Sequence, residues 1–588
     1  MSQSSDQQVL LQLAQAQLDR VPDDPTSLAF LDSCMPHLQA TPQAAALVEG
    51  LLAKAEALSE QSPRKVTKQL RELAVRFASD DLQVMFRILY RLQHGSSDER
   101  AESIEWAERC LAEATTLTDQ IAATNALLSS WISSGGSWQR AMAIYQDYKA
   151  LLQQLVESKD EKTQTEAQAL ASLAPIGMLF FYFEDDPRLN RPLRNQIAAI
   201  AQTHLQATLP DRVQRYQFPL LRTRTARSPR VGYFAGSLRQ HSVGWLCRWL
   251  LKYHDRSRFD IHLYSSRPSD DWVQNELRRE YGDRFHDVSS SIPEIADRIY
   301  DDEIDILVEL DSLTSFGGCG VVALKPAPIQ VHWLGYDASG IPAVDYFIAD
   351  PYVLPDDAQD YYHEKIWRLP QTYIAVDGFE VHTPSLRRDQ LNIPSDAVVF
   401  LSSQTGMKRN IDNARLQLQV VKAVPNSYFL IKSFRANPEL TEAFFRDLAE
   451  SEGVSSDRLR FLPDVASEFL HRANLALADV VLDTYPYNGA TTTLEALWMG
   501  LPIITRVGEQ FAARNSYTMM MNTGITEGLA WSDAEYLEWG IRLGTDLKLR
   551  QDIFGRLRRS RHTSALWNSR QFARSMEAAY DQMWKLKA

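Results

Sequence analysis

The 588-residue chain lacks the features that mark several common protein classes. Its four cysteines are scattered and include no C-x-x-C pair, which gives no metal framework and suits a reducing compartment. No G-x-x-x-x-G-K-[ST] occurs, which excludes a P-loop nucleotide hydrolase. No G-x-G-x-x-G follows a predicted first strand, which argues against a dinucleotide redox cofactor.

Long apolar runs and a surplus of positive charge are also missing. The longest apolar run, residues 171–183, contains Pro175 and Gly177, and we interpret it as a core helix because it is too short to span a bilayer. The first ten residues lack the pattern of a secretory signal. A net charge of −13 argues against general binding to nucleic acid or to anionic membranes. We therefore expect a cytoplasmic protein with neither kind of partner.

Residues 1–215 have the composition of successive helices, rich in Ala, Leu, Gln and Glu. Ala107 and Ala141 each stand four residues before a bulky side chain, and their separation of 34 residues is the tetratricopeptide (TPR) period. Two degenerate copies leave a generic helical bundle open as an alternative. Either arrangement predicts a surface for partner proteins. We interpret residues 216–230, which combine prolines with arginines, as a linker.

From residue 231 the pattern changes to strands that alternate with helices. Strands are predicted at 231–236, 259–265, 304–310, 329–336 and 344–349, and then at 398–402, 428–431, 459–462, 480–482 and 503–505. This alternation predicts two doubly wound parallel sheets, in a first lobe at residues 231–390 and a second at 391–588 that ends in helices. Two Rossmann-like lobes of this kind bind a ligand between them, which favours a nucleotide-sugar transferase.

Residues 477–507, LADVVLDTYPYNGATTTLEALWMGLPIITRV, predict a strand, a turn, a helix and a second strand. The turn contains Gly489, and three hydroxyl side chains, Thr491 to Thr493, open the helix. Backbone N–H groups and the positive end of the helix dipole would meet there, which suits a phosphate or diphosphate. Thr492 and Glu495 also have the T-x-x-E spacing of a capping box, so plain helix capping is an alternative reading.

Several long motifs in the same order resemble the O-GlcNAc transferase and SPINDLY family. They include RVGYFAGSLRQHSVGWL, KPAPIQVHWLGYDASGIPAVDYFIAD, EKIWRLPQTY and the 477–507 stretch. The resemblance extends from about residue 230 to the end, and the helical first third is similar only in kind. It implies a metal-independent, inverting glycosyltransferase of the GT-B fold, which needs no cofactor because the nucleotide sugar is its substrate.

The resemblance also assigns roles to individual residues. His241 would lie between donor sugar and acceptor, as a general base or a positioning group, and Lys408 would steady the departing diphosphate. Thr491 and Thr492, followed by Thr493, would hold the diphosphate, and Glu495 would bind the ribose. His471 would stack on the nucleobase, whose edge would meet the main chain at Ala466. Thr405 and Gly489 complete the predicted donor site.

Departures from the family pattern leave the donor open. Ser237 replaces a common acidic residue, the GYDASG loop is one residue short, and Ala490 and Asn474 replace a histidine and an arginine. UDP-GlcNAc is the favoured donor, with GDP-fucose or UDP-glucose as alternatives, and the expected acceptor is a serine or threonine of a protein recruited by the helical region. A transferase acting on a glycan and a non-catalytic helical scaffold are the other readings.

Overall fold

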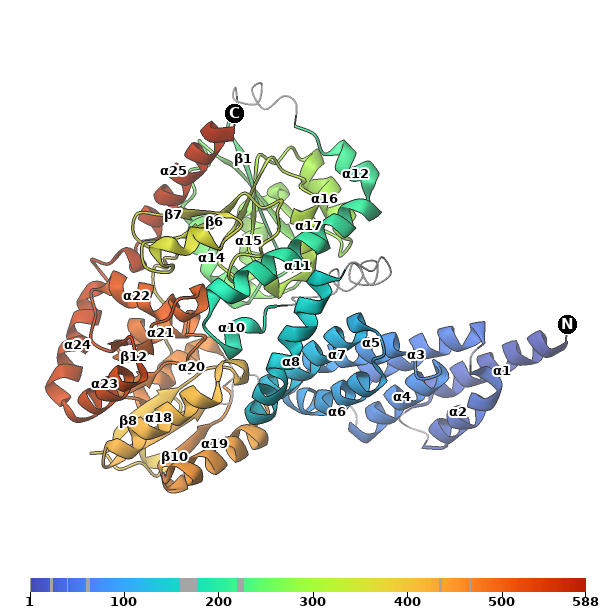
Figure 1. The fold of residues 1–588 in the computed structure, drawn as a ribbon, viewed down its shortest axis with the longest axis horizontal. Helices are drawn as coiled ribbons and strands as arrows, with labels where there is room; N and C mark the ends of the chain where they lie inside the picture. Colours follow the sequence, from blue (N-terminus) through green and yellow to red (C-terminus); the bar gives the residue numbers. More distant parts are fainter. Residues whose placement is uncertain are drawn as a thin grey trace. The chain divides into compact units, whose positions relative to one another are not determined.

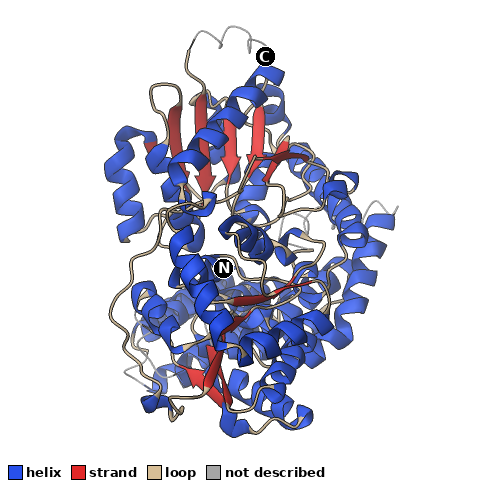
Figure 2. Cartoon of the chain, turned by 90° about the vertical axis from the view of Figure 1, so that its left-hand side faces the viewer, coloured by secondary structure: helices blue, strands red, loops and turns tan. Residues whose placement is uncertain are grey.

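The computed structural model describes residues 2–21, 25–39, 41–59, 64–158, 177–218, 227–432, 436–465 and 467–587. The chain folds as two units, Met1–Ser133 and Ser134–Ala588. Figure 2 shows helices and two groups of strands in the chain. Among the described residues, no helix has the length and apolar character needed to cross a membrane.

The first unit is built from helices that pack against one another in pairs. Its main pairs are α1 with α2, α3 with α4 and α5 with α6. Leucines such as Leu31, Leu47, Leu51 and Leu70 are fully buried between the first four helices. The helices are α1 (Ser2–Asp19), α2 (Pro25–Leu38), α3 (Pro42–Leu58), α4 (Arg64–Phe77), α5 (Leu82–Gln93), α6 (Ser97–Glu113) and α7 (Leu117–Ser134).

Within its described residues, the second unit opens with the helices α8 (Trp138–Glu157), α10 (Phe180–Phe183), α11 (Pro187–Thr208) and α12 (Pro210–Arg215). The described part of residues 1–215 is therefore helical as expected, although residues 134–215 fold with the α/β part of the chain. Of the core helix predicted at 171–183, residues 171–176 lie outside the described part, and α10 is buried at all four positions. Ala107 and Ala141, the small residues of the predicted repeat, are fully buried on α6 and α8.

The first sheet has seven parallel strands in the order β3-β2-β1-β4-β5-β6-β7. Six of these strands follow the order of a dinucleotide-binding fold, whose ligands bind at the carboxyl ends. The strands are β1 (Arg230–Ala235), β2 (Asp260–Ser265), β3 (Phe285–Asp287), β4 (Ile306–Glu309), β5 (Ile329–His332), β6 (Tyr346–Ala349) and β7 (Lys365–Arg368). Between them run α14 (Ser242–Tyr253), α15 (Trp272–Tyr281), α16 (Ile292–Asp301) and α17 (Phe316–Ala323).

The second sheet has six parallel strands in the order β10-β9-β8-β11-β12-β13. The strands are β8 (Val398–Ser402), β9 (Ser427–Lys432), β10 (Leu459–Leu462), β11 (Val480–Leu482), β12 (Ile503–Arg506) and β13 (Leu529–Ala530). The helices are α18 (Ile411–Ala423), α19 (Pro438–Glu452), α20 (Glu468–Asn474), α21 (Thr491–Met499), α22 (Asn515–Thr523), α23 (Asp533–Thr545) and α24 (Leu547–Ser560). The predicted pair of doubly wound lobes, the GT-B architecture, is confirmed.

The last helix, α25 (Ser569–Lys587), packs against α14 of the first lobe (Figure 1). The Tyr233 hydroxyl on β1 lies 2.9 Å from that of Tyr580, and the Glu577 carboxylate lies 3.1 Å from Nδ1 of His254. All four side chains are buried. The chain thus crosses from the first lobe to the second and returns, so α25 completes the first lobe.

Candidate functional site

The turn between β11 and α21 is organised by a buried carboxylate. Oδ1 of Asp483, which directly follows β11, accepts the backbone N–H of Thr484 at 2.9 Å and that of Gly489 at 2.8 Å. Its Oδ2 accepts the Thr505 hydroxyl at 2.8 Å, and burial raises the pKa of this carboxyl. These hydrogen bonds fold residues 484–489 back over the end of the sheet, where α21 begins.

The amino end of α21 has no side-chain cap. Its N-cap residue is Ala490, which carries no acceptor. The alternative reading, a capping box of Thr492 and Glu495, is wrong because the Glu495 carboxylate is buried and accepts Nε of Arg472 at 2.9 Å. An uncapped helix start keeps N–H groups and the positive dipole end available to an anion.

Lys408 reaches the same turn from the short helix Gly406–Lys408, which follows the neighbouring strand β8. Its Nζ donates to the carbonyl of Asn488 at 2.8 Å and lies 4.0 Å from the ring centre of Tyr487. Burial lowers the pKa of Lys408 to about 8, partly offset by the Asp483 carboxylate. The structure therefore brings the predicted cation and the predicted anion-binding helix start together, although 80 residues separate Lys408 from Asn488.

The predicted threonines differ in what their side chains contact. Thr491 and Thr492 are partly exposed at the helix start, and the Thr492 hydroxyl accepts Nε2 of Gln404 at 2.8 Å. Thr493 is buried, and its hydroxyl lies 2.7 Å from that of Ser516, inside the lobe. Thr491 and Thr492 are thus the hydroxyls that the structure leaves at the helix start.

Gly489 is required here by close approach rather than by its backbone angles. A Cβ atom at this position would lie 2.4 Å from Oγ1 of Thr493 and 2.7 Å from Nε2 of Gln404. Thr405, which is partly exposed, precedes the Gly406–Lys408 turn. Gln404 is a contact that our reading of the sequence missed, since no spacing rule connects it with a threonine 88 residues away.

Two further predicted residues, His471 and Glu495, meet beside α21. Nε2 of His471 lies 3.7 Å from Oε2 of Glu495, and its Nδ1 lies 3.3 Å from Nζ of Lys432. Burial and the two neighbouring cations, Lys432 and Arg472, lower the pKa of His471 to about 3, so its ring is neutral at pH 7. Neither Lys432 nor Arg472 was predicted from the sequence. Ala466 lies outside the described residues.

In the first lobe, His241 is the N-cap residue of α14. Its Nδ1 accepts the backbone N–H of Val243 at 3.3 Å, so the proton of the neutral ring lies on Nε2. The loop before it is held by a buried carboxylate, because Asp311 accepts the N–H of Gly236 at 2.8 Å and the hydroxyl of Ser237. Burial and the neighbouring Glu309 raise the pKa of Asp311 to about 6.

The carboxyl ends of the two sheets face each other. The amide of Gln240, in the loop after β1, donates to the Glu468 carboxylate at the start of α20 at 3.2 Å. Tyr336, after β5, packs 5.7 Å from Tyr487, after β11. His241 and the α21 turn therefore lie on facing ends of the lobes. This arrangement can hold an anionic donor on the second lobe and present its sugar to a group bound on the first.

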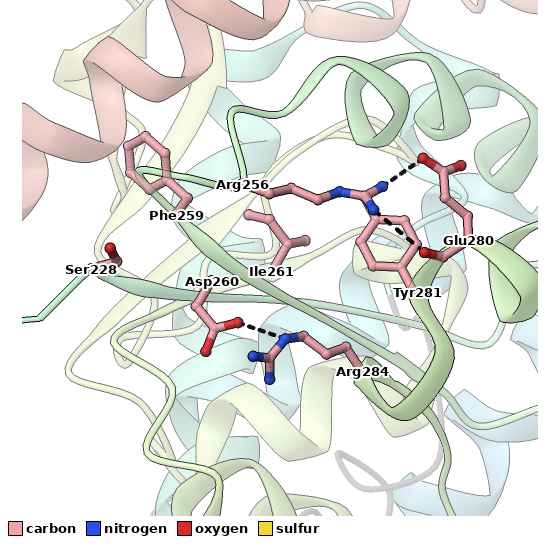
Figure 3. A pocket seen from close by; sticks show the side chains of 8 residues that line it. All are labelled: Ser228, Arg256, Phe259, Asp260, Ile261, Glu280, Tyr281 and Arg284. Atoms are coloured by element: carbon pink, nitrogen blue, oxygen red, sulfur yellow. Dashed lines mark hydrogen bonds and ion pairs between the residues drawn. The ribbon is translucent and has the colours of Figure 1, made fainter.

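A charged hollow of about 330 Å³ lies near the amino ends of the first sheet's strands, away from the carboxyl ends that face the second lobe (Figure 3). Arg256 and Arg284 line it, but Arg256 pairs with Glu280 at 2.5 Å and Arg284 with Asp260 at 2.8 Å. Because both guanidinium groups already have carboxylate partners, this hollow is a poor site for a diphosphate.

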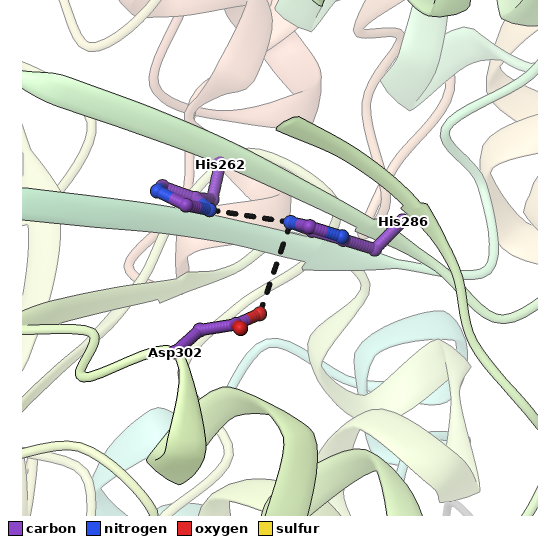
Figure 4. Close-up of side chains that lie close together, drawn as sticks. All are labelled: His262, His286 and Asp302. Atoms are coloured by element: carbon purple, nitrogen blue, oxygen red, sulfur yellow. Dashed lines mark hydrogen bonds and ion pairs between the residues drawn. The ribbon is translucent and has the colours of Figure 1, made fainter. Parts of the chain in front are cut away.

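His262, His286 and Asp302 lie close together nearby, in an arrangement that could hold a metal ion (Figure 4). Each already has hydrogen-bond partners. Nδ1 of His262 lies 3.2 Å from Nε2 of His286, and Asp302 accepts Nε of Arg298 and the hydroxyl of Tyr264, each at 2.8 Å. Arg298 also contacts Nδ1 of His286 at 3.1 Å. We interpret the group as a hydrogen-bonded network of the first lobe.

Known proteins resemble this chain in both sequence and structure. It is 28% identical over 364 residues to "Probable UDP-N-acetylglucosamine--peptide N-acetylglucosaminyltransferase SPINDLY" of Petunia hybrida, an alignment covering 60% of this chain and 38% of the relative. It is 30% identical over 366 residues to the similarly named SEC protein of Arabidopsis thaliana, covering 61% and 37%. The chain thus spans less than half the length of these plant relatives.

A solved structure, a mutant of the Thermobaculum terrenum O-GlcNAc transferase, matches with a TM-score of 0.73. The match covers 93% of this chain and 99% of that one at 23% identity, which supports the fold alone. The model of glycosyl transferase family 41 matches residues 142–386 and 375–576, which together span both lobes and the helices that open the second unit. The resemblance found in the sequence is therefore confirmed, and the chain belongs to glycosyl transferase family 41.

Proposed function

We propose that the chain transfers a sugar, GlcNAc in the favoured case, from a nucleotide sugar to a serine or threonine hydroxyl of a protein. The observation that carries this proposal is the meeting of the Lys408 ammonium group with the uncapped start of α21. Two positive groups around one turn suit a diphosphate, and both gain in strength as negative charge develops on the leaving group.

The chemistry is an inverting single displacement. The acceptor hydroxyl attacks the anomeric carbon while the bond to the diphosphate breaks, and its proton passes to a phosphate oxygen of the departing diphosphate or to water. The diphosphate leaves toward Lys408, Thr491 and Thr492. No metal ion is needed in this scheme, because Lys408 and the α21 dipole supply the positive charge. Glu495 and His471 would hold the ribose and base, with Thr405 and Gly489 lining the donor site.

His241 acts in this scheme as a hydrogen-bond donor to the acceptor or the sugar. Its Nδ1 already accepts the Val243 N–H, so a neutral ring offers Nε2–H and no second lone pair. This supports the positioning role over that of general base. A His241→Gln variant, which keeps an N–H donor but cannot take a proton, would then retain more activity than His241→Ala.

The names of the plant relatives favour UDP-GlcNAc as donor and a peptide as acceptor. Recruitment of that acceptor is the role we propose for the helical N-terminal unit, in which the buried Ala107 fits a TPR-like repeat. We do not favour GDP-fucose, a glycan acceptor or a non-catalytic scaffold, although each gives a distinct result in the following test.

The test is a thermal-shift panel with UDP-GlcNAc, UDP-glucose and GDP-fucose, followed by a transfer assay on peptides. A donor present at 100 times its Kd raises the free energy of unfolding by about 2.7 kcal/mol, which is a readily measured shift. We expect UDP-GlcNAc to give the largest shift. Stabilisation by GDP-fucose alone would instead indicate fucose transfer, and no shift with any donor would favour the scaffold.

A further inference from the structure

The turn that carries Lys408 is held by side chains from the helices that precede the first lobe. Nε1 of Trp138, at the start of α8, donates to the carbonyl of Gly406 at 3.1 Å, and the Trp138 side chain is fully buried. Gly406 begins the short helix that ends at Lys408. A hydrogen bond two residues from the catalytic ammonium group thus comes from a residue 268 positions earlier in the chain.

The segment around α10 supports the same turn from a second direction. Tyr182 stacks on Tyr487, with 4.9 Å between ring centres and an angle of 18° between the planes. Tyr487 is the ring over which the Lys408 ammonium lies, at 4.0 Å. The Asn410 amide, two residues after Lys408, donates to the carbonyls of Tyr182 and Phe183 at 3.4 and 3.3 Å. Backbone and ammonium group of the lysine are therefore both held by the helical segment.

These contacts belong to one packed cluster. The Phe183 ring lies 5.2 Å from that of Trp138 and stacks on Tyr145 of α8 at 4.4 Å. Tyr336, from the loop after β5, lies 5.7 Å from Tyr487. Residues from the opening helices, the first lobe and the second lobe thus meet beside Lys408. A side chain in such a cluster has little rotational freedom, which keeps the ammonium group in place before the donor binds.

We infer that Trp138 and Tyr182 are positioning residues for Lys408, and that the helices before the first lobe are part of the catalytic apparatus. This inference rests on the proposed role of Lys408 at the departing diphosphate. The hydrogen bond from Trp138 fixes the backbone of the turn that carries Lys408. The Tyr182 ring holds the Tyr487 ring, over which the ammonium group lies. Loss of either contact lets the lysine move and admits water around it.

The first experiment compares Trp138→Phe with Trp106→Phe in the full-length chain. Both tryptophans are fully buried, and the Trp106 indole donates within α6, to Glu102 at 3.4 Å. We expect Trp138→Phe to lower kcat about 10-fold, equivalent to ~1.4 kcal/mol, with the donor KM within twofold of wild type. Trp106→Phe should leave kcat unchanged. A wild-type kcat in Trp138→Phe would overturn the inference.

A second readout does not depend on sugar transfer. The pH dependence of Lys408 acetylation, measured by mass spectrometry, reports the pKa of its ammonium group, which faces the Asp483 carboxylate and the Tyr487 phenol. We expect an apparent pKa near 8 in the wild type and a higher one in Trp138→Phe, because added water favours the charged form. An unchanged pKa contradicts the inference, whereas an inactive wild type contradicts only the proposed function.

Variants at Tyr182 separate the ring from the hydroxyl. Tyr182→Phe keeps the stack on Tyr487 and should retain wild-type kcat and Lys408 pKa. Tyr182→Leu removes the stack and should lower kcat about fivefold while raising the lysine pKa. Thermal unfolding of each variant identifies general destabilisation, which would affect both variants and the donor KM. Equal behaviour of the two variants would exclude the proposed role of the Tyr182 ring.

Discussion

The first and second lobes each place a loop and a helix start after a strand of the sheet, and the two loops are closed differently. In the first lobe the Asp311 carboxylate accepts the Gly236 amide and the Ser237 hydroxyl, and His241 caps α14. In the second lobe α21 begins at Ala490 with no side-chain cap. Both loops are held by a buried carboxylate, Asp311 in the first lobe and Asp483 in the second, but only the first lobe caps its helix start with a side chain. The uncapped start of α21 is the one that an incoming anion can use.

This difference indicates that two lobes of the same architecture are suited to different tasks. A loop whose N–H groups are occupied internally is rigid and can present a side chain such as His241 in a fixed direction. A helix start without a cap costs about 0.5–2 kcal/mol of stability relative to a good cap. We expect that cost to be recovered when the diphosphate binds.

Removal of Lys408, the cation beside the uncapped start of α21, should have the largest effect on activity. Lys408→Ala is expected to lower kcat by about 100- to 1,000-fold, since removing one preorganised group that stabilises developing charge costs about this much. Affinity for UDP, measured by calorimetry, should change only a few-fold, because the interaction strengthens mainly in the transition state. Lys422→Ala, at an exposed position of α18, is the control. Full activity in Lys408→Ala would refute the assigned role.

A side-chain cap added to the start of α21 should weaken binding of the diphosphate without lowering the stability of the fold. Ala490→Asp places a carboxylate at the free start of α21, where it would compete with the diphosphate. We expect the affinity for UDP to fall by 10-fold or more, about 1.4 kcal/mol, while Tm stays unchanged or rises. Ser291→Asp, at the start of α16 where the serine makes no capping bond, is the matched control. Undiminished UDP binding in Ala490→Asp would show that this helix start does not hold the donor.

Removal of the Asp311 carboxylate, which holds the loop of the first lobe, should have a smaller effect on catalysis. Asp311→Asn replaces one of the two oxygens that accept the Gly236 N–H and the Ser237 hydroxyl with an NH2 group. We expect a loss of about 1–3 kcal/mol in the free energy of unfolding. Because the loop leads to His241, kcat should fall about 10-fold. The double variant Ser237→Asp/Asp311→Ser returns a carboxylate to the same place and should recover part of both. If the double variant has a lower free energy of unfolding and a lower kcat than Asp311→Asn, the position of the carboxylate matters more than its presence.

The alkaline side of the pH profile tests the second lobe, because it reports the charge of Lys408. Lys408 has a lowered pKa of about 8, so its charge is present at pH 7 and is lost as the pH rises above 8. We expect kcat/KM, which reports the free enzyme, to fall about 10-fold per pH unit beyond that point. Lys408→Arg keeps its charge, and whatever activity it retains should show no such decline. A flat wild-type profile to pH 10 would contradict the assignment.

Local pattern predicted much of the fold. The strands β8, β10 and β11 match their predicted bounds because each is a short, mostly apolar run. The strands β3 and β13, three and two residues long, were missed because such short segments show no period. β7 lies in a segment that looked irregular, since its sequence Lys-Ile-Trp-Arg begins and ends with a charge.

Family motifs mark the residues of the predicted site, whereas the contacts between distant positions could not be predicted from the sequence. The T-x-x-E spacing suggested a helix cap, but in the structure the Glu495 carboxylate accepts a hydrogen bond from Arg472. The bond between Ser237 and Asp311, 74 residues apart, is equally invisible to spacing rules. The contact of Trp138 with the lysine turn combines a residue from the helical region with one from the second lobe. No local pattern connects these pairs.

The return of α25 to the first lobe has a consequence for biosynthesis. While the chain is being translated, the surface of α14 that α25 covers must wait until residues 569–587 have left the ribosome, a delay of seconds or more at ~5–20 residues per second. Tyr233 and His254 contact Tyr580 and Glu577, so they acquire these partners only then. A stop codon shortly before residue 569 would therefore yield a chain with a damaged first lobe and an intact second sheet.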